Sequence, residues 1–552
     1  MLTTLHIGNF KAFAALQRIP LKPLTLIYGA NSSGKSSVLH SLLLAHHALD
    51  TGNLDVHRTN VGGESVDLGG FRQFVHRREA HRRVEWALDL DAGSFRGRLA
   101  DLFRPVKQVT VLLSVGIALD DRDQPLPEAE PALHTYELVA DGVSILRMSH
   151  RQSGGLQLDR LDHEHPIFRE VITAIVELST TTENLAPEDF EGLGEVIDEL
   201  VSEVMVRSGR FLPYRLTDSE GFSPGTSKRL FPISKARRKD ELGAAVRSFL
   251  PRLIDEILRD IRREITSELL RIRYLGPLRS YPPRHLSLSQ HHDSNWYAGG
   301  GYAWDEIRKN ARVRQQVNEW LAAPNRLQTP YELIVRDLVS LDQLEDPLLE
   351  GLENIALSIG QKEDGDSTGS GINPLIKDPE AEAVKIRELI RSSNIDKLNE
   401  LIMIDRRSNT VVSHRDVGIG VSQVLPVLVG AYASREQIVA IEQPEIHLHP
   451  ALQADLGDVF IQSALGFRRN RFLIETHSEH LLLRIMRRMR QTSNDELPEG
   501  MPPVSPEDVC VLFVQPKGTA SVVLQLELDE EGEFLDAWPG GFFEEGYRER
   551  FG

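Results

Sequence analysis

The chain has 552 residues, 41% of them hydrophobic and 26% charged, which is ordinary for a globular protein and long enough for roughly two to four domains. The formal net charge of −18 argues against nucleic-acid binding by overall attraction, so any such contact needs a local basic patch. The single cysteine, Cys510, excludes an internal disulfide and a thiolate zinc cluster.

Two further features bear on location and partners. No apolar run approaches the roughly 20 residues of a membrane-spanning helix, and the N-terminus lacks a secretory signal pattern, so we expect a cytoplasmic protein without a membrane segment. Basic segments that keep a nucleic-acid partner possible occur at 76–83, 235–239, 467–471 and 487–490. Solvated surface is the commoner role of such segments.

The N-terminal part of the chain carries a phosphate-loop pattern. Residues 2–28 predict two strands, which run into IYGANSSGKSS at 27–37, and an apolar helix follows. Glycines let successive backbone N–H groups face phosphate oxygens, Lys35 reaches the β- and γ-phosphates, and the Ser36 hydroxyl is a Mg²⁺ ligand. A solvated Gly/Ser turn is the alternative. The expected nucleotide-binding residues are Gly29, Ala30, Asn31, Ser32, Ser33, Gly34, Lys35, Ser36 and Ser37.

The middle of the chain changes pattern twice. Residues 84–150 alternate like an antiparallel β meander, whereas 165–272 is helical, with isoleucines and leucines from Ile254 to Leu269 at three- and four-residue spacing. A polar, Gly/Ser-rich segment at 360–374 predicts a mobile loop. We expect these domains: an N-terminal lobe 1–160, a helical, coiled-coil-like insertion 161–272, a return segment 273–405, a C-terminal lobe 406–495 and a β-hairpin tail 496–552.

The C-terminal part supplies candidates for the second half of a nucleotide site. In QIVAIEQPEIHLHP at 437–450, a buried-strand run ends at Glu442, and a carboxylate at the carboxyl end of a parallel strand can hold the water of a magnesium ion. Residues 472–477, FLIETH, predict another strand, which ends beside His477. Residues 416–426, DVGIGVSQVLP, form a Gly-rich turn before a helix, which can present N–H groups to a phosphate.

The order of these motifs resembles the split ABC-type ATPase heads of the SMC, RecF and OLD group, and is most similar to the OLD-like AAA ATPases of prokaryotic defence and DNA-maintenance loci. The resemblance implies an α/β fold: an ABC/SMC-like P-loop ATPase head, with a mixed sheet, an antiparallel β subdomain and a helical insertion. The matching segments are NFKAF (9–13), PLTLIYGANSSGKSS (23–37), VDLGGFRQFVH (66–76), YLGPLRSYPPR (274–284), DVGIGVSQVLP, IEQPEIHLHP and ETHSEHLLLR (475–484).

The resemblance also implies roles for single residues. The catalytic set would be Lys35, Glu442, Gln443 and His477, with Ser36 and Glu442 at the Mg²⁺ ion. Residues beyond the phosphate loop would contact ATP as a Q-loop glutamine and a degenerate signature: Gln73, Gly418, Gly420, Ser422 and Gln423. Two such heads sandwich two ATP molecules, so a homodimer is expected, with higher oligomers open.

Two departures from the family pattern affect the expected activity. Gln443 stands where the general base usually follows the Walker B acid, and an amide can orient water but cannot accept its proton. We therefore expect slow hydrolysis, although Glu445 or His477 could act as base, or Gln443 could be the ordinary residue of this branch with unimpaired turnover. Only residues 478–552 follow His477, too few for a TOPRIM nuclease domain.

The expected function is an ATP-dependent dimer switch in antiphage defence or DNA maintenance that works with a separate effector, a nuclease or a toxin. The alternative is an ATP-bound scaffold or toxin-holding assembly protein with negligible turnover. Measured ATP hydrolysis separates the two.

Overall fold

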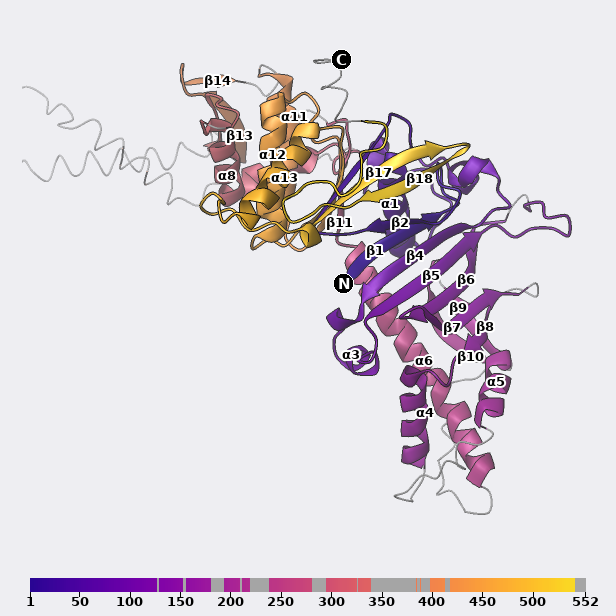
Figure 1. The fold of residues 1–552 in the computed structure, drawn as a ribbon. Helices are drawn as coiled ribbons and strands as arrows, with labels where there is room; N and C mark the ends of the chain where they lie inside the picture. Colours follow the sequence, from indigo (N-terminus) through magenta and orange to yellow (C-terminus); the bar gives the residue numbers. More distant parts are fainter. Residues whose placement is uncertain are drawn as a thin grey trace, which may run out of the picture. The chain divides into compact units, whose positions relative to one another are not determined.

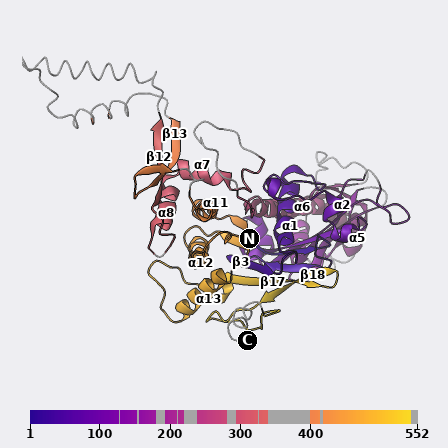
Figure 2. The same ribbon diagram turned by 90° about the horizontal axis from the view of Figure 1, so that it is seen from above.

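The computed structural model describes most of the chain (Figures 1 and 2). The chain forms two compact units, the first from 1–280, 292–303 and 419–552, the second from 281–291 and 304–418, as far as these ranges are described. The expected loop at 360–374 lies outside the described residues. The structure describes 1–126, 129–151, 155–179, 193–208, 211–218, 238–279, 294–324, 326–338, 398–412 and 417–541, with the single residues 384 and 388.

A six-stranded sheet in the order β11-β15-β16-β3-β17-β18 positions the candidate site in the first unit. The first five strands are parallel, and β18 is antiparallel to β17. Continuous apolar runs suit strands that are covered on both faces. The bounds are β3 Leu24–Gly29, β11 Ile272–Leu275, β15 Ile438–Glu442, β16 Arg471–Glu475, β17 Val509–Lys517 and β18 Ala520–Leu526.

Helices cover both faces of this sheet. Leu473 of β16 belongs to the core that includes α1 (Lys35–Thr51), whereas the preceding residue, Phe472, packs against Phe460 of α12 with ring centroids 4.9 Å apart. In Figure 2, α11, α12 and α13 lie on the side of β3 opposite α1. Their bounds are α11 Ile419–Ala433, α12 Pro450–Leu465 and α13 Glu479–Ser493.

A nine-stranded antiparallel sheet is the second large element of this unit, in the order β10-β9-β8-β7-β6-β5-β4-β1-β2. Strands β4 to β7 pair in sequence, which confirms the meander expected at 84–150. The bounds are β1 Leu2–Gly8, β2 Gln17–Pro20, β4 Val84–Asp91, β5 Gln108–Gly116, β6 Ala132–Ala140, β7 Val143–His150, β8 Leu156–Leu161, β9 Val204–Ser208 and β10 Pro213–Asp218.

The region 161–272, expected to be helical, is only partly so. It holds α4 (Pro166–Ser179), α5 (Leu193–Glu203) and the 32-residue α6 (Arg238–Leu269), whose isoleucine and leucine stripe is buried. It also holds β9 and β10, which extend the antiparallel sheet. Val204 and Val206 of β9 alternate with exposed or half-buried neighbours, a period-two pattern that fits a sheet and not a helix.

Shorter elements complete the first unit: α2 (Phe71–Phe74), α3 (Arg98–Leu102) and 3₁₀ turns at Gly63–Ser65, His76–Arg78, Ala92–Ser94 and Pro506–Asp508. Among the described residues, no helix is both long and apolar enough to cross a membrane.

The second unit contains most of helix α7 (Gly301–Lys309), helix α8 (Ala311–Ala322) and a small sheet. Helix α8 follows α7, and β12 (Tyr331–Leu338), β13 (Leu398–Asp405) and β14 (Thr410–Val412) form an antiparallel sheet. The side chain of Asn318 ties α8 to β12, because its amide donates to Leu333 O and its oxygen accepts from Leu333 N, each at 2.9 Å.

Candidate functional site

The candidate residues from the two ends of the chain meet at one edge of the six-stranded sheet. Strand β16 lies between β3 and β15, all three parallel, with Glu475 opposite Ile27 on one side and opposite Glu442 on the other. Parallel strands end at the same edge, so the segments that follow them must lie together. The phosphate loop, Glu442 and the turn that carries His477 are therefore neighbours.

The phosphate loop needs glycine at both ends of its curve. Gly29 has φ +145°, and a Cβ there would lie 2.4 Å from the carbonyl oxygen of Val514. Gly34 has φ +101°, and a Cβ there would lie 2.5 Å from the Cβ of Ala12. Both conformations and both approaches exclude a side chain without backbone movement. Gly34 is the N-cap of α1, so the loop leads directly into the positive end of that helix.

Lys35 is held inside the loop. Its ammonium donates to the carbonyl oxygens of Gly29 at 3.1 Å and Ala30 at 2.9 Å, and the residue is only 4% exposed. Burial lowers the pKa of Lys35, while the carboxylates of Glu475, Glu445 and Glu442 oppose that shift. The ammonium thus lies on the carbonyl oxygens of the phosphate loop itself.

Glu442 is fixed by partners that the motif reading did not include. The Tyr274 hydroxyl donates to Glu442 Oε1 at 2.8 Å, and His40 Nε2 lies 3.4 Å from the same oxygen. Lys11 Nζ donates to His40 Nδ1 at 2.7 Å, which leaves the imidazole proton on Nε2, facing the carboxylate. Burial lowers the pKa of His40 and lowers the pKa of Lys11 to about 8.

Glu475 adds a second carboxylate beside Glu442. The residue is 4% exposed, and its Oε2 is buried without a hydrogen-bond partner among the described residues. Burial, and next the charge of Glu442, raise the pKa of Glu475 to about 7, although a hydrogen bond with Ser36 and the charge of Lys35 oppose this. Hydroxyl and carboxylate oxygens are the donors that Mg²⁺ takes, so the group around Ser36 fits a hydrated magnesium ion.

Glu445 holds the turn that carries His477. Its Oε1 accepts from the backbone N–H of His477 and its Oε2 from the hydroxyl of Thr476, each at 2.7 Å. Burial raises the pKa of Glu445, and these donors oppose the shift. Both oxygens are therefore engaged in positioning His477, which does not favour Glu445 as the general base. Burial, and then the charge of Lys35, lower the pKa of His477.

Arg279 joins Gln443 to the signature segment. Its guanidinium donates to the carbonyl oxygens of Glu442 and Gln443 at 3.0 Å and of Gln423 at 3.2 Å, and Gln423 Nε2 donates back to Arg279 O at 3.1 Å. Burial lowers the pKa of Arg279 to about 10. Gln443 itself adopts the left-handed region with φ +46°, and its N–H donates to Glu475 O at 2.7 Å. Its backbone is therefore held from both sides.

Of the signature residues, Gly418 is exposed, Gly420 is half-buried, and Ser422 and Gln423 are buried. A Cβ on Gly420 would lie 2.7 Å from the carbonyl oxygen of His447. Ser422 is 3% exposed and donates to Ile419 O at 3.0 Å, and Gln423 is 6% exposed. The start of α11 is thus accessible, whereas the Ser422 and Gln423 side chains face their own chain.

Gln73 lies on the short helix α2, outside the six-stranded sheet. It is exposed in α2, and the carbonyl of the next residue, Phe74, accepts from Lys11 N at 2.7 Å. This hydrogen bond links α2 to Lys11, whose side chain contacts His40. The assignment of Gln73 to a nucleotide stays a prediction.

Sequence reasoning missed five residues that the fold brings to this site: Lys11, His40, Tyr274, Arg279 and Glu475. Lys11, Tyr274, Arg279 and Glu475 lie in segments that carried the family resemblance, but their partners come from other segments. Glu475 had a readable signal, because an acidic residue ends a buried strand two positions before His477.

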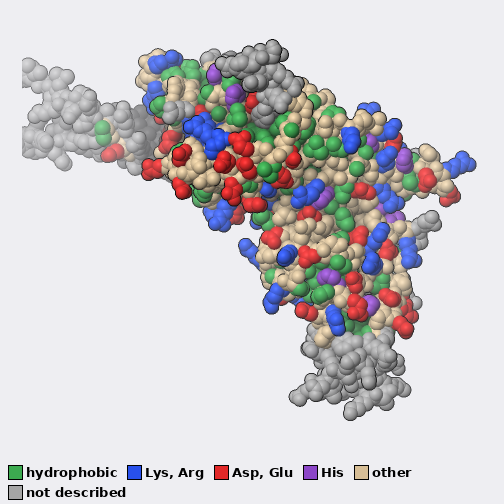
Figure 3. Space-filling view, viewed as in Figure 1, with side chains coloured by type: hydrophobic (Ala, Val, Ile, Leu, Met, Phe, Trp, Pro, Cys, Tyr) green, Lys and Arg blue, Asp and Glu red, His purple; other side chains and the backbone are tan. Residues whose placement is uncertain are grey.

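The basic segments at 467–471 and 487–490 are engaged within the chain. Arg471 pairs with Glu268, Arg488 with Asp458, and Arg490 with Glu533. Figure 3 shows acidic and basic side chains beside one another over α12 and α13. These contacts favour a structural role for both segments.

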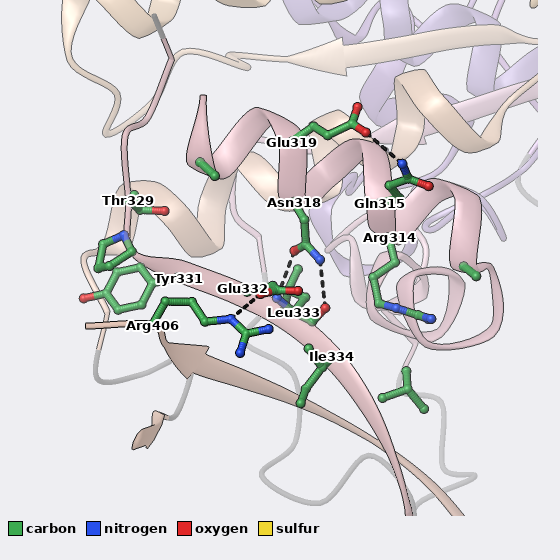
Figure 4. Close-up of a pocket in the computed structure, with 14 residues that line it drawn as sticks. Arg314, Gln315, Asn318, Glu319, Thr329, Tyr331, Glu332, Leu333, Ile334 and Arg406 are labelled. Atoms are coloured by element: carbon green, nitrogen blue, oxygen red, sulfur yellow. Dashed lines mark hydrogen bonds and ion pairs between the residues drawn. The ribbon is translucent and has the colours of Figure 1, made fainter. Parts of the chain in front are cut away.

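A separate hollow of about 740 Å³ lies in the second unit, between α8 and β12 (Figure 4). Arg406 and Glu332 form an ion pair at its wall. Its lining residues include none of the predicted site residues.

The strand order, with β16 between the phosphate-loop strand and the acidic strand β15, fits a P-loop ATPase of the AAA class. Within this class, the chain belongs to the family described as "AAA domain, putative AbiEii toxin, Type IV TA system", whose model matches residues 146–484. That match includes Glu442 and His477, and the phosphate loop precedes it. A second model, "Protein of unknown function (DUF3696)", matches residues 504–549.

Solved structures of SMC heads are also similar to this chain, at low scores. The SMC head bound to the C-winged helix domain of ScpA is 10% identical, with 96% of this chain and 98% of that chain covered and a TM-score of 0.35. The SMC head domain from Thermotoga maritima is 9% identical, with 96% and 99% covered and a TM-score of 0.32. Scores this low carry no weight in the assignment. No curated protein matches the chain.

Proposed function

We propose that this protein binds ATP with Mg²⁺ at the edge formed by β3, β16 and β15, and hydrolyses it slowly. The observation that carries the proposal is the parallel pairing of these strands, which brings Lys35 and Ser36 to Glu442 and His477. In nucleotide hydrolases of this class, a phosphate loop holds the phosphates and an acidic residue at the end of a nearby strand holds Mg²⁺.

The chain's own residues have distinct parts in this reaction. The Lys35 ammonium exchanges the carbonyls of Gly29 and Ala30 for phosphate oxygens, and Ser36 and Glu442 hold Mg²⁺, which supplies charge neutralisation when bound. The Gln443 amide orients the attacking water, supported by a backbone that Arg279 and Glu475 hold. His477 faces the γ-phosphate, with its backbone set by Glu445. Turnover is slow because an amide accepts no proton.

We further propose that two ATP-bound chains associate as a homodimer and signal to a separate effector, a nuclease or a toxin, in antiphage defence or DNA maintenance. The exposed residues Gly418 and Ile419, at the start of α11, support the dimer, since this surface can meet the nucleotide of a second chain. The description of the family, which includes a toxin–antitoxin system, supports an effector of that kind.

The decisive experiment measures ATP binding by calorimetry and phosphate release by the purified protein, with and without Mg²⁺. Lys35→Ala should weaken ATP binding at least about tenfold and abolish turnover, because a charge-assisted contact to phosphate is lost. Lys107→Ala is the control, since Lys107 is an exposed lysine of the β sheet region and should change neither value. Wild-type protein that takes up no ATP would contradict the proposal.

The second candidate is an ATP-bound scaffold or toxin-holding protein with negligible turnover. Gln443 favours it, because it replaces the usual carboxylate. Tight ATP binding with no phosphate release above that of Lys35→Ala would support the scaffold, and Mg²⁺-dependent release would exclude it.

A further inference from the structure

The position of Glu475 in the sheet suits a residue that binds a ligand better than a residue that only stabilises the fold. It ends β16, the strand between β3 and β15, and stands opposite Glu442 in the register. Residues opposite each other on parallel strands point to the same face. Both carboxylates therefore point to the face covered by α1, the helix that begins with Lys35 and Ser36.

One carboxyl oxygen of Glu475 is left free by the described residues to bind a ligand from outside the chain. Ser36, whose hydroxyl is the expected magnesium ligand, acts on Glu475 by lowering its pKa against the effect of burial. The carboxyl oxygen Oε2 is buried and has no hydrogen-bond partner among the described residues, in a residue that is 4% exposed. A buried polar atom without a partner lowers stability by about 1–3 kcal/mol, so its retention calls for another role.

Glu442 is engaged differently. Its Oε1 accepts from the Tyr274 hydroxyl at 2.8 Å and has His40 Nε2 at 3.4 Å. The sequence motifs predicted Glu442 as the one carboxylate that holds the water of the magnesium ion. In the structure the contacts with His40 and Tyr274 belong to Glu442, whereas Ser36 interacts with Glu475.

We propose that Glu475 is a second carboxylate of the divalent-cation site, shared with Glu442 and Ser36. This inference rests on the proposed function, because the cation enters with ATP. Two carboxylates that face each other in a buried place repel, and a cation between them and the phosphates removes both the repulsion and the unpartnered oxygen. The site accordingly takes a hard cation such as Mg²⁺ or Mn²⁺.

The test is Glu475→Gln, which keeps the size of the side chain and an oxygen for the Ser36 hydroxyl. ATP affinity is measured by calorimetry in EDTA and across a Mg²⁺ titration. We expect unchanged affinity for ATP in EDTA. The Mg²⁺ concentration at the midpoint of the titration (the Mg²⁺ midpoint) should rise at least about tenfold, since one charged ligand of the cation is lost. An unchanged Mg²⁺ midpoint would overturn the inference.

A second readout excludes a merely structural role. In the absence of metal and nucleotide, Glu475→Gln should melt at the same temperature as wild type or higher, because it removes a buried charge beside Glu442. A lower melting temperature would mean that Glu475 stabilises the fold and would overturn the inference.

Glu268→Gln is the matched control. Glu268 is 7% exposed, and its Oε2 accepts from Leu2 N at 3.2 Å and pairs with Arg471. Its substitution should lower the melting temperature and leave the Mg²⁺ midpoint unchanged. Wild-type protein that binds no ATP with Mg²⁺ would refute the proposed function as well. Wild-type binding with no Mg²⁺ effect of Glu475→Gln would refute only the role of Glu475.

Discussion

The hydroxyl of Tyr274, on β11, donates a 2.8 Å hydrogen bond to the carboxylate of Glu442, at the end of β15. The two strands are parallel neighbours, and Tyr274 stands opposite Ala440 in the register. The residue two positions further along β15 is Glu442, on the same face of the sheet. Tyr274 therefore holds the Glu442 carboxylate in place from β11, the edge strand beside β15.

This support predicts that Tyr274→Phe weakens both the fold and the site. Loss of a hydrogen bond to a buried carboxylate should lower the free energy of unfolding by about 1–3 kcal/mol, measured by urea denaturation. Phosphate release should fall, while ATP affinity in EDTA should not. Tyr214→Phe is the control, because Tyr214 is 43% exposed, and it should change stability by less than about 0.5 kcal/mol. Equal effects of the two variants would contradict this role of Tyr274.

The phosphate loop predicts a contrast between two glycines. In Gly34→Ala, the new Cβ would lie 2.5 Å from that of Ala12, so the loop must shift and ATP affinity should fall at least about tenfold. Gly52 ends α1 with φ +73°, and a Cβ there would meet no other atom within 4 Å. Gly52→Ala should therefore cost only about 1–2 kcal/mol of stability and leave ATP affinity intact. Calorimetry and urea denaturation measure the two effects, and undiminished ATP binding by Gly34→Ala would refute the loop geometry.

A buried ion pair joins α12 to α13 and should be important for stability. Arg488 meets Asp458 through two hydrogen bonds of 2.7 Å, and Arg484 adds a third at 2.6 Å. Asp458→Asn removes the ion-pair partner of the buried Arg488, although Arg484 keeps Asp455, so we expect a loss of about 2–4 kcal/mol in urea denaturation.

The exposed pair of Asp101 and Arg104, 2.7 Å apart, provides the matched control for that substitution. Asp101→Asn should change stability by less than about 1 kcal/mol, because water screens exposed charges. Similar losses in the two variants would show that the α12–α13 pair is not buried in solution.

The single cysteine predicts a simple chemical result. Cys510 is 2% exposed on β17, and burial raises the pKa of its thiol to about 12. Because the thiolate is the reactive species, the native protein should react with a disulfide reagent very slowly. One thiol per chain should appear on denaturation. Rapid reaction of the folded protein would show that β17 opens readily.

His134 predicts part of the acid sensitivity of the antiparallel sheet. Burial, with the charges of Arg83 and His150, lowers the pKa of His134 to about 4 from its ordinary 6.5. Between these values the unfolded chain binds a proton that the folded chain does not, so stability falls as pH drops from about 6.5 toward 4.

His134→Gln should reduce that loss, since a glutamine amide can still donate to Gly116 O, which His134 Nε2 contacts at 3.2 Å. Urea denaturation at pH 7.5 and pH 5 should show a stability decrease that is smaller by about 1 kcal/mol in the variant. Identical decreases in both proteins would mean that His134 titrates normally.

The sequence by itself determined the local parts of this protein. The phosphate loop was readable because Gly29, Gly34, Lys35 and Ser36 lie within eight successive residues, and their chemistry depends on local backbone conformation. The apolar strand that ends at Glu442 and the amphipathic stripe of α6 were readable because side-chain periodicity reflects burial. The α/β class followed from the family resemblance that these motifs carry.

Only the tertiary structure decided which distant side chains meet. Strand order put β16 between β3 and β15, and register set Glu475 opposite Glu442, whereas a shift of one residue would have turned its side chain to the other face. The same packing engaged both oxygens of Glu445 at the His477 turn and directed Ser422 inward. Local periodicity carries no information about partners from other segments, so these contacts arise from packing of the whole sheet.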